Sequence, residues 1–145
     1  MIYIGADKHG FKTIQSVIGY LKDKNIPFTN VGVGSSDEDM ELENLIPAVV
    51  RGVRENKDNT GVLVCGTGVG VVVGANKFSG IRAVLGGEEK IVEWSRQYDD
   101  CNVLCLPGWS ISDEATKKSL HIFLETDYDG DPSRLAMTQT FDTWH

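Results

Sequence analysis

Short apolar runs alternate with segments of helical spacing five times along this chain of 145 residues. Such an alternation is typical of a parallel sheet whose two faces are both covered by helices. The expected strands span residues 2–6, 28–33, 61–65, 81–86 and 102–108, and the expected helices span residues 11–21, 42–55, 69–77, 88–98 and 113–125. We therefore expect a single α/β domain over residues 1–145. It should have three α/β/α layers and a Rossmann-like, five-stranded parallel sheet of order 2-1-3-4-5.

An acidic segment with Gly and Pro follows the last expected helix. We expect residues 131–145 to be a C-terminal tail that contacts a partner subunit through Phe141 and Trp144. The alternating aspartates of residues 127–131 lack the later glutamate of a calcium loop, so no metal site is expected there.

Composition excludes several classes of protein. The net charge of −7 argues against sequence-independent binding of nucleic acid or of an acidic membrane surface. The N-terminus lacks the pattern of a signal peptide, and no apolar run reaches the roughly 18 residues of a membrane span. The three cysteines are odd in number and lie in apolar surroundings, which is typical of reduced thiols in the cytoplasm.

Reactive side chains follow two of the expected strands. The segment Asp7-Lys8-His9-Gly10 follows the first strand, and Cys65-Gly66-Thr67-Gly68 follows the third. In an order 2-1-3 these strands are neighbours, and ligands bind beyond the carboxyl ends of such strands. We therefore expect the two segments to face one crevice.

The motif CGTGVG sets Cys65 between a strand and a helix start. The field of a helix N-terminus favours a thiolate, and Gly-rich backbone can turn its N–H groups toward an anion. Thr67 adds a hydroxyl. A base beside an oxyanion site is what proton abstraction next to a carbonyl requires.

Other interpretations of this motif remain. Cys65 could be a small buried side chain and the glycines could serve turn geometry alone. Cys101 and Cys105 lie within an apolar strand and are expected in the core. Lys77 comes too late for a P-loop, and the spacing G-x-G-x-G does not match a dinucleotide fingerprint.

Three segments together resemble the ribose-5-phosphate isomerase type B family, which also includes the subunits of galactose-6-phosphate isomerase. These segments are GADKHGF (5–11), CGTGVGVVVGANKFSGIRA (65–83) and SRQYDDCNVLCLPG (95–108). The resemblance extends from Met1 to about Gly130, and its central motif is long enough to be specific.

The resemblance implies an aldose–ketose isomerase that works without a cofactor, through an enediolate. Cys65 would be the base that moves a proton between C1 and C2. The family's enediolate-binding positions fall on Gly66, Thr67, Gly68 and Gly70, and Asp7 would bind substrate hydroxyls. The family forms dimers, often paired into tetramers, in which a neighbouring subunit completes each active site.

Several positions depart from the family pattern. Lys8 stands where the family has His, with His9 one place later, and Tyr98 and Asp99 replace the ring-opening His and the Asn after it. The family's phosphate-binding arginine after the last strand falls on Trp109. A second one is missing from the C-terminal pattern, where Arg134 lies nearby but out of register. The expected catalytic residues are Cys65, Thr67 and Tyr98, and the expected substrate-binding residues are Asp7, Lys8, His9, Gly66, Gly68, Gly70, Asp99 and Arg134.

Three hypotheses follow. The chain isomerises a sugar phosphate with Lys8, His9 and Arg134 as replacement anchors; or it isomerises a different, unphosphorylated sugar on which Trp109 stacks; or it is a non-catalytic sugar-binding protein or the partner of an unlike subunit. Under all three it binds a small sugar molecule and neither nucleic acid nor membrane.

Overall fold

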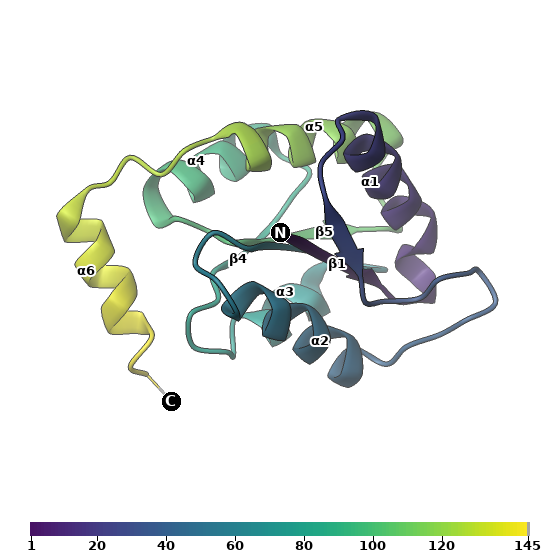
Figure 1. The fold of residues 1–145 in the computed structure, drawn as a ribbon, viewed down its shortest axis with the longest axis horizontal. Coiled ribbons are helices and arrows are strands. Elements are labelled where there is room, and N and C mark those ends of the chain that lie inside the picture. The colour runs from purple at the N-terminus through teal and green to yellow at the C-terminus, as the bar shows by residue number, and fades with distance from the viewer. Residues whose placement is uncertain (145) are drawn as a thin grey trace.

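Five strands and six α-helices alternate along residues 1–144, the part of the chain that the computed structural model describes (Figure 1). The strands are β1 (Ile2–Ala6), β2 (Phe28–Asn30), β3 (Thr60–Cys65), β4 (Ala83–Leu85) and β5 (Val103–Pro107). The α-helices are α1 (Phe11–Asp23), α2 (Leu42–Arg54), α3 (Val69–Ala75), α4 (Glu89–Asp99), α5 (Asp113–Glu125) and α6 (Pro132–Phe141). A short 3-10 helix, η1 (Lys8–Gly10), joins β1 to α1.

All five strands are parallel and lie in the order β2-β1-β3-β5-β4. The predicted parallel sheet is confirmed, but the predicted order 2-1-3-4-5 is wrong for its last two strands. Strand β5 has four fully enclosed positions, whereas the three residues of β4 are all partly or fully exposed. The longer apolar strand therefore takes the central place, and the short one forms the edge.

Two layers of helices cover the sheet, as predicted (Figure 1). Helices α1, α4 and α5 pack on one face and α2 and α3 on the other. Side chains of β3 alternate between the two cores: Val62 and Val64 join the first, and Leu63 and Cys65 join the second. The Cys65 side chain consequently lies on the face covered by α2 and α3.

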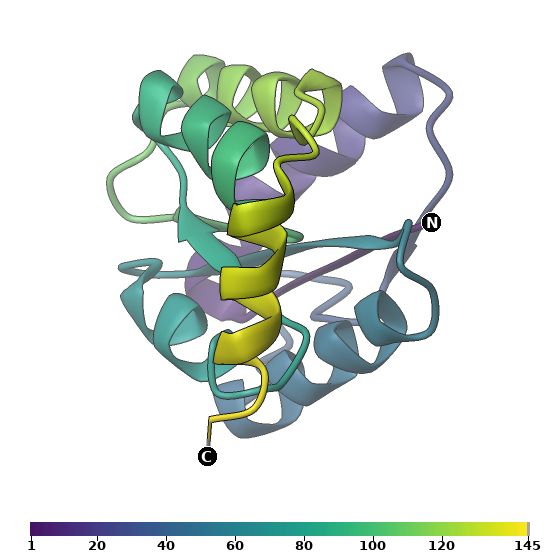
Figure 2. The same cartoon turned by 90° about the vertical axis from the view of Figure 1, so that its left-hand side faces the viewer.

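Helix α6 replaces part of the expected C-terminal tail. Asp131 caps it by accepting hydrogen bonds from the amides of Ser133 and Arg134 at 2.9 and 3.1 Å, and Pro132 occupies its first turn. The helix crosses the sheet edge beside β4, from the layer of α4 toward the opposite layer (Figure 2). Beyond α6, Asp142 accepts a hydrogen bond from the Gly80 amide at 2.7 Å. The last predicted tail residue, 145, lies outside the described part.

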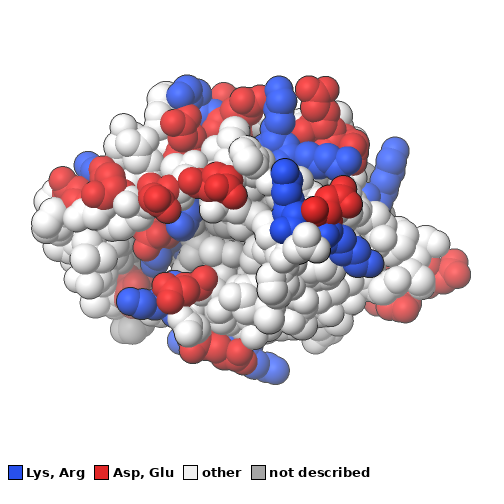
Figure 3. Space-filling view, turned by 45° about the horizontal axis from the view of Figure 1, so that its top comes forward, with Lys and Arg blue, Asp and Glu red and all other residues white. Residues whose placement is uncertain are grey.

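The surface is mixed in charge. Acidic and basic side chains are interspersed on the side that carries α1, α4 and α5 (Figure 3). In residues 1–144, no helix has the length and apolarity that crossing a bilayer requires.

Candidate active site

Three segments meet at the carboxyl edge of the sheet, where β1, β3 and β5 end side by side. The amide of Asp7 donates to the Val64 carbonyl at 3.3 Å, and the amide of Gly108 donates to the Cys65 carbonyl at 2.8 Å. The predicted meeting of the segments after β1 and β3 is therefore confirmed. The segment after β5 joins them because β5, not β4, is the neighbour of β3.

Cys65 ends β3 with its side chain 5% exposed, and a tight turn follows it. Gly68 has φ +73°, a left-handed conformation that Gly adopts without strain. The Thr67 hydroxyl accepts a hydrogen bond from the Val69 amide at 3.2 Å. Within residues 1–144, the amides of Thr67 and Gly68 donate no hydrogen bond. This turn thus places unpaired N–H groups next to the thiol, where they can receive a negatively charged oxygen.

The other two thiols are buried, as Cys65 is, but they lie away from the turn. Cys101 and Cys105 are buried among core side chains, as predicted. Desolvation by burial raises the pKa of Cys101 to about 11 and raises that of Cys105 further. Both are therefore neutral thiols near pH 7, and neither belongs to the carboxyl-edge turn.

Asp7 lies beside this turn and is 8% exposed. One of its carboxylate oxygens accepts a hydrogen bond from the Gly10 amide at 3.0 Å and so caps η1. Lys8 forms an ion pair with Asp39, with 3.2 Å between Nζ and Oδ2. Asp39 lies in the loop before α2, and sequence analysis did not identify it as a partner.

Trp109 covers the glycine that follows Cys65. Its amide donates to the Gly66 carbonyl at 2.9 Å, and its indole lies so close that a Cβ on Gly66 would be 2.4 Å from a ring atom. The His9 ring meets the indole edge to face, with 5.2 Å between centroids and 78° between planes. His9 and Trp109 therefore join Cys65 and Gly66 in one cluster.

Tyr98, Asp99 and Arg134 lie elsewhere. Helix α4 starts after the carboxyl end of β4 and returns to the amino edge, where the Arg82 Nε donates to the Asp99 carbonyl at 3.1 Å. Arg82 directly precedes β4. The Arg134 guanidinium pairs with Asp129 and lies 5.0 Å from the centre of the Tyr98 ring. Within one chain, the structure does not bring these three predicted residues to Cys65.

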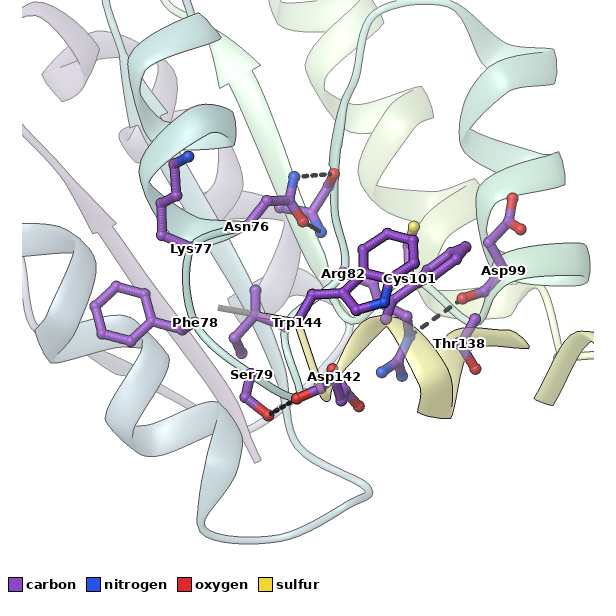
Figure 4. A pocket seen from close by; sticks show the side chains of 13 residues that line it. Asn76, Lys77, Phe78, Ser79, Arg82, Asp99, Cys101, Thr138, Asp142 and Trp144 are labelled. Atoms are coloured by element: carbon purple, nitrogen blue, oxygen red, sulfur yellow. Dashed lines mark hydrogen bonds between the residues drawn. The ribbon is translucent and has the colours of Figure 1, made fainter. Parts of the chain in front are cut away.

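A pocket of about 500 Å³ lies at this amino edge, between residues 76–83 and α6 (Figure 4). Asp99 and Trp144 line it, but Cys65 does not. The polar groups in its wall mostly bond to one another: Ser79 Oγ, for example, donates to the Asp142 carbonyl at 3.2 Å. The thiol that lines this pocket is Cys101, whose pKa burial raises to about 11, so it is a poor base near pH 7. The carboxyl edge is therefore the candidate active site.

No group of three His, Cys, Asp or Glu side chains in residues 1–144 has the arrangement of a metal site. The groups available for chemistry at the carboxyl edge include a thiol, backbone amides, the Thr67 hydroxyl, a carboxylate and an imidazole.

Residues 2–139 match the Ribose/Galactose Isomerase family. The chain belongs to this family of sugar-phosphate isomerases, as the resemblance implied.

Individual members are similar over nearly their full length. Ribose-5-phosphate isomerase B of Escherichia coli (strain K12) is 33% identical over 129 residues, which are 89% of this chain and 86% of that one. The crystal structure of a ribose 5-phosphate isomerase from Thermotoga maritima aligns with a TM-score of 0.92 at 30% identity, over 99% of this chain and 97% of that chain. The enzyme from Mycoplasma genitalium, with bound ribulose-5-phosphate, aligns with a TM-score of 0.90 at 30% identity, over 99% and 97% of the two chains.

Proposed function

We propose that this chain interconverts an aldose and a ketose phosphate of the ribose 5-phosphate and ribulose 5-phosphate type, with Cys65 as the base. The observation that carries this proposal is the position of the Cys65 thiol next to the unpaired amides of Thr67 and Gly68. The similarity to ribose-5-phosphate isomerases B of Escherichia coli and Mycoplasma genitalium supports isomerisation of a sugar phosphate as the reaction class.

The proposed reaction moves hydrogen within one molecule. The Cys65 thiolate takes the C2 proton of the open-chain aldose, and the C2–H electron pair forms the C1–C2 double bond. The carbonyl oxygen on C1 becomes an oxyanion that the turn amides and the Thr67 hydroxyl stabilise. Cys65 then returns the proton to C1 while the O2 proton passes to O1, which yields the ketose. No electrons enter or leave, so the proposed reaction needs no redox cofactor.

Ring opening must precede this step for a cyclic sugar. Tyr98 is the residue predicted at the ring-opening position and Asp99 is predicted to bind substrate, and both lie at the amino edge of the same chain. We propose that a second copy, in a homodimer or a tetramer, brings its amino edge to the Cys65 turn. An unlike subunit in that place is the alternative.

Phosphate recognition is the part of the site in which this chain departs most from the family pattern. Lys8 and Arg134, two of the predicted anchors, are engaged by Asp39 and Asp129. A phosphate would have to displace these carboxylates or bind to cations of a partner. This pairing favours the second candidate function, isomerisation of an unphosphorylated sugar. A non-catalytic sugar-binding or partner subunit is the third candidate, and for each we propose a cytoplasmic location.

The test is turnover in D2O with a panel of five- and six-carbon aldoses, each with and without phosphate, followed by NMR. Ketose that carries solvent deuterium at C1 would support proton transfer through an enediolate. Ketose that a folded Cys65→Ser variant forms at the wild-type rate would contradict the role of Cys65. Product from unphosphorylated sugars alone would favour the second candidate. A folded protein that converts none of the panel would contradict an isomerase made of one kind of chain.

A further inference from the structure

Trp109 presents the most unusual surface at the carboxyl edge. It follows Gly108, the residue after β5, whose amide donates a hydrogen bond to the Cys65 carbonyl. Trp109 nevertheless remains 66% exposed. Aromatic side chains commonly line the sites that bind small ligands, and Trp109 lies beside the candidate base.

The exposed indole is nevertheless held in place. The backbone amide of Trp109 donates a hydrogen bond to the Gly66 carbonyl at 2.9 Å, so the Trp109 backbone is fixed to the turn after Cys65. One part of the ring rests on Gly66, where no side chain larger than hydrogen fits. The imidazole of His9 braces it edge to face at 5.2 Å. A ring fixed in this way loses little conformational entropy when a ligand binds to its free face.

Near Trp109, within residues 1–144, there is no unpaired cationic side chain to which a ligand over the indole could form an ion pair. The segment Pro107–Ile111 carries no charged residue. Lys8, which adjoins His9, is paired with Asp39. A ligand that extends from Cys65 over Gly66 therefore meets an apolar aromatic face before it meets an unpaired cation.

We propose that Trp109 is a specificity-determining residue that packs against the C–H face of the sugar carbons next to the reacting carbonyl. This inference rests on the proposed function, because it places the reacting end of the sugar at Cys65. Its consequence is that the contact depends on the carbon skeleton and its hydroxyl stereochemistry. Sugars with and without a terminal phosphate should make it equally well.

Tryptophan emission tests this contact without requiring turnover. The chain has three tryptophans, so the variant W94F/W144F leaves Trp109 as the only reporter. A Cys65→Ser substitution in the same chain prevents conversion during the titration. We expect a saturable change of emission with D-ribose 5-phosphate and with D-ribose, and none with inorganic phosphate.

Two results of the titration would overturn the proposal. The first is unchanged emission at sugar concentrations at which NMR line broadening shows that the sugar is bound. The second is emission that changes with protein concentration and no longer with sugar, which would place Trp109 in a contact between copies of the chain. Either result leaves the D2O turnover experiment unaffected, so failure of this inference and failure of the proposed function are distinguishable.

Steady-state kinetics provide the second test. We expect Trp109→Ala to raise KM about tenfold with kcat nearly unchanged, and Trp109→Phe to raise it less, since a smaller ring keeps part of the packing. Trp94→Ala, also an exposed tryptophan but on α4, is the matched control and should leave both constants unchanged. Unchanged KM and kcat in Trp109→Ala would contradict a substrate contact.

Discussion

The two edges of the sheet use their polar groups in different ways. At the amino edge, the Asn102 side chain donates to the Gly80 carbonyl at 2.8 Å and accepts from the Arg82 amide at 2.9 Å. Arg82 and Arg96 both pair with Asp100 there, and in residues 1–144 the buried Nε of Arg96 is an exception that has no partner. The turn after Cys65 at the carboxyl edge instead leaves its amides unpaired and its neighbouring indole exposed. Groups that are already satisfied stabilise the fold, whereas the unsatisfied ones are available for a substrate.

The largest effect is expected from an experiment that joins the two edges. Cys65→Ser and Tyr98→Phe chains should each lose activity, by about 10²–10⁴-fold for the base. If each site combines the carboxyl edge of one copy with the amino edge of another, a mixed dimer regains one intact site. Random pairing of equal amounts should then restore roughly a quarter of the wild-type rate. Mixed dimers that native mass spectrometry detects, but that remain inactive, would refute shared sites.

Removing the side-chain amide of Asn102 at the amino edge should lower stability more than it lowers catalytic activity. Asn102→Ala deletes both side-chain hydrogen bonds and strands the Arg82 amide, so we expect a loss of about 2 kcal/mol in the free energy of unfolding. Urea denaturation measures this loss. Asn44→Ala, on the exposed side of α2, is the control and should change stability by less than about 0.5 kcal/mol. Equal losses in the two variants would show that the amino-edge network contributes nothing.

Crowding at the carboxyl edge can be measured with a double-mutant cycle. Gly66→Ala sets a methyl group against the Trp109 indole and should cost roughly 1–3 kcal/mol of stability. The cost should shrink by about 1 kcal/mol in a Trp109→Ala background, because the clash is relieved. Gly19→Ala is the control: it lies in α1 with open space around its Cβ and should be neutral or stabilising. A cost that is unchanged by Trp109→Ala would mean that the backbone alone requires glycine at position 66.

The buried thiol of Cys101 should make stability fall at high pH. Its pKa rises from 9.0 to about 11 on folding, chiefly through desolvation, so the folded state holds the proton more tightly than the unfolded state. This contribution is complete below pH 9 and is lost as the pH rises toward 11, with a slope of at most roughly 1.4 kcal/mol per pH unit. We expect the stability of the wild type to fall more steeply over this range than that of Cys101→Ala. Parallel curves for the two proteins would contradict the assignment.

The smallest effect is expected at the rim of the carboxyl edge. Asp39→Asn removes the charge that pairs with Lys8, and an ion pair this exposed contributes little to stability because water screens it. The freed Lys8 should lower KM for a phosphorylated sugar by about twofold to threefold and leave KM for the free sugar unchanged. Glu38→Gln, in the same loop, is the charge-matched control. A decrease in both KM values would show that the effect is not specific to phosphate.

Sequence patterns predicted most of the fold because apolar spacing determines which side of each element is buried. The stripe of Ile14, Val17 and Leu21 indicated α1, and all three side chains are fully enclosed. The order of the last two strands depends on which of them is longer and better enclosed. Sequence patterns predicted a strand over residues 81–86, but β4 has only three residues, so its place at the edge was not predicted. Helix α6 was missed because it buries only Thr138 and has no apolar stripe, although Asp131-Pro132 is a helix-start signal.

The candidate site was predictable where it follows from adjacent strands and not where it depends on long-range pairs. Asp7 and Cys65 meet because β1 and β3 are neighbours, and the sequence carried that information. The pairing of Lys8 with Asp39 joins residues far apart in a loop without periodicity, and no sequence signal marked it. The contact of Trp109 with Gly66 became visible only with β5 placed beside β3.

The most direct test of the central claim is the rate at which the C2 hydrogen of the preferred sugar exchanges with D2O, compared between Cys65→Ser and Cys101→Ala. If the carboxyl-edge thiol moves the proton, Cys65→Ser should lose exchange by at least about 10²-fold, whereas Cys101→Ala should exchange at the wild-type rate. Exchange that persists in folded Cys65→Ser would contradict the account and would place the base elsewhere in the protein.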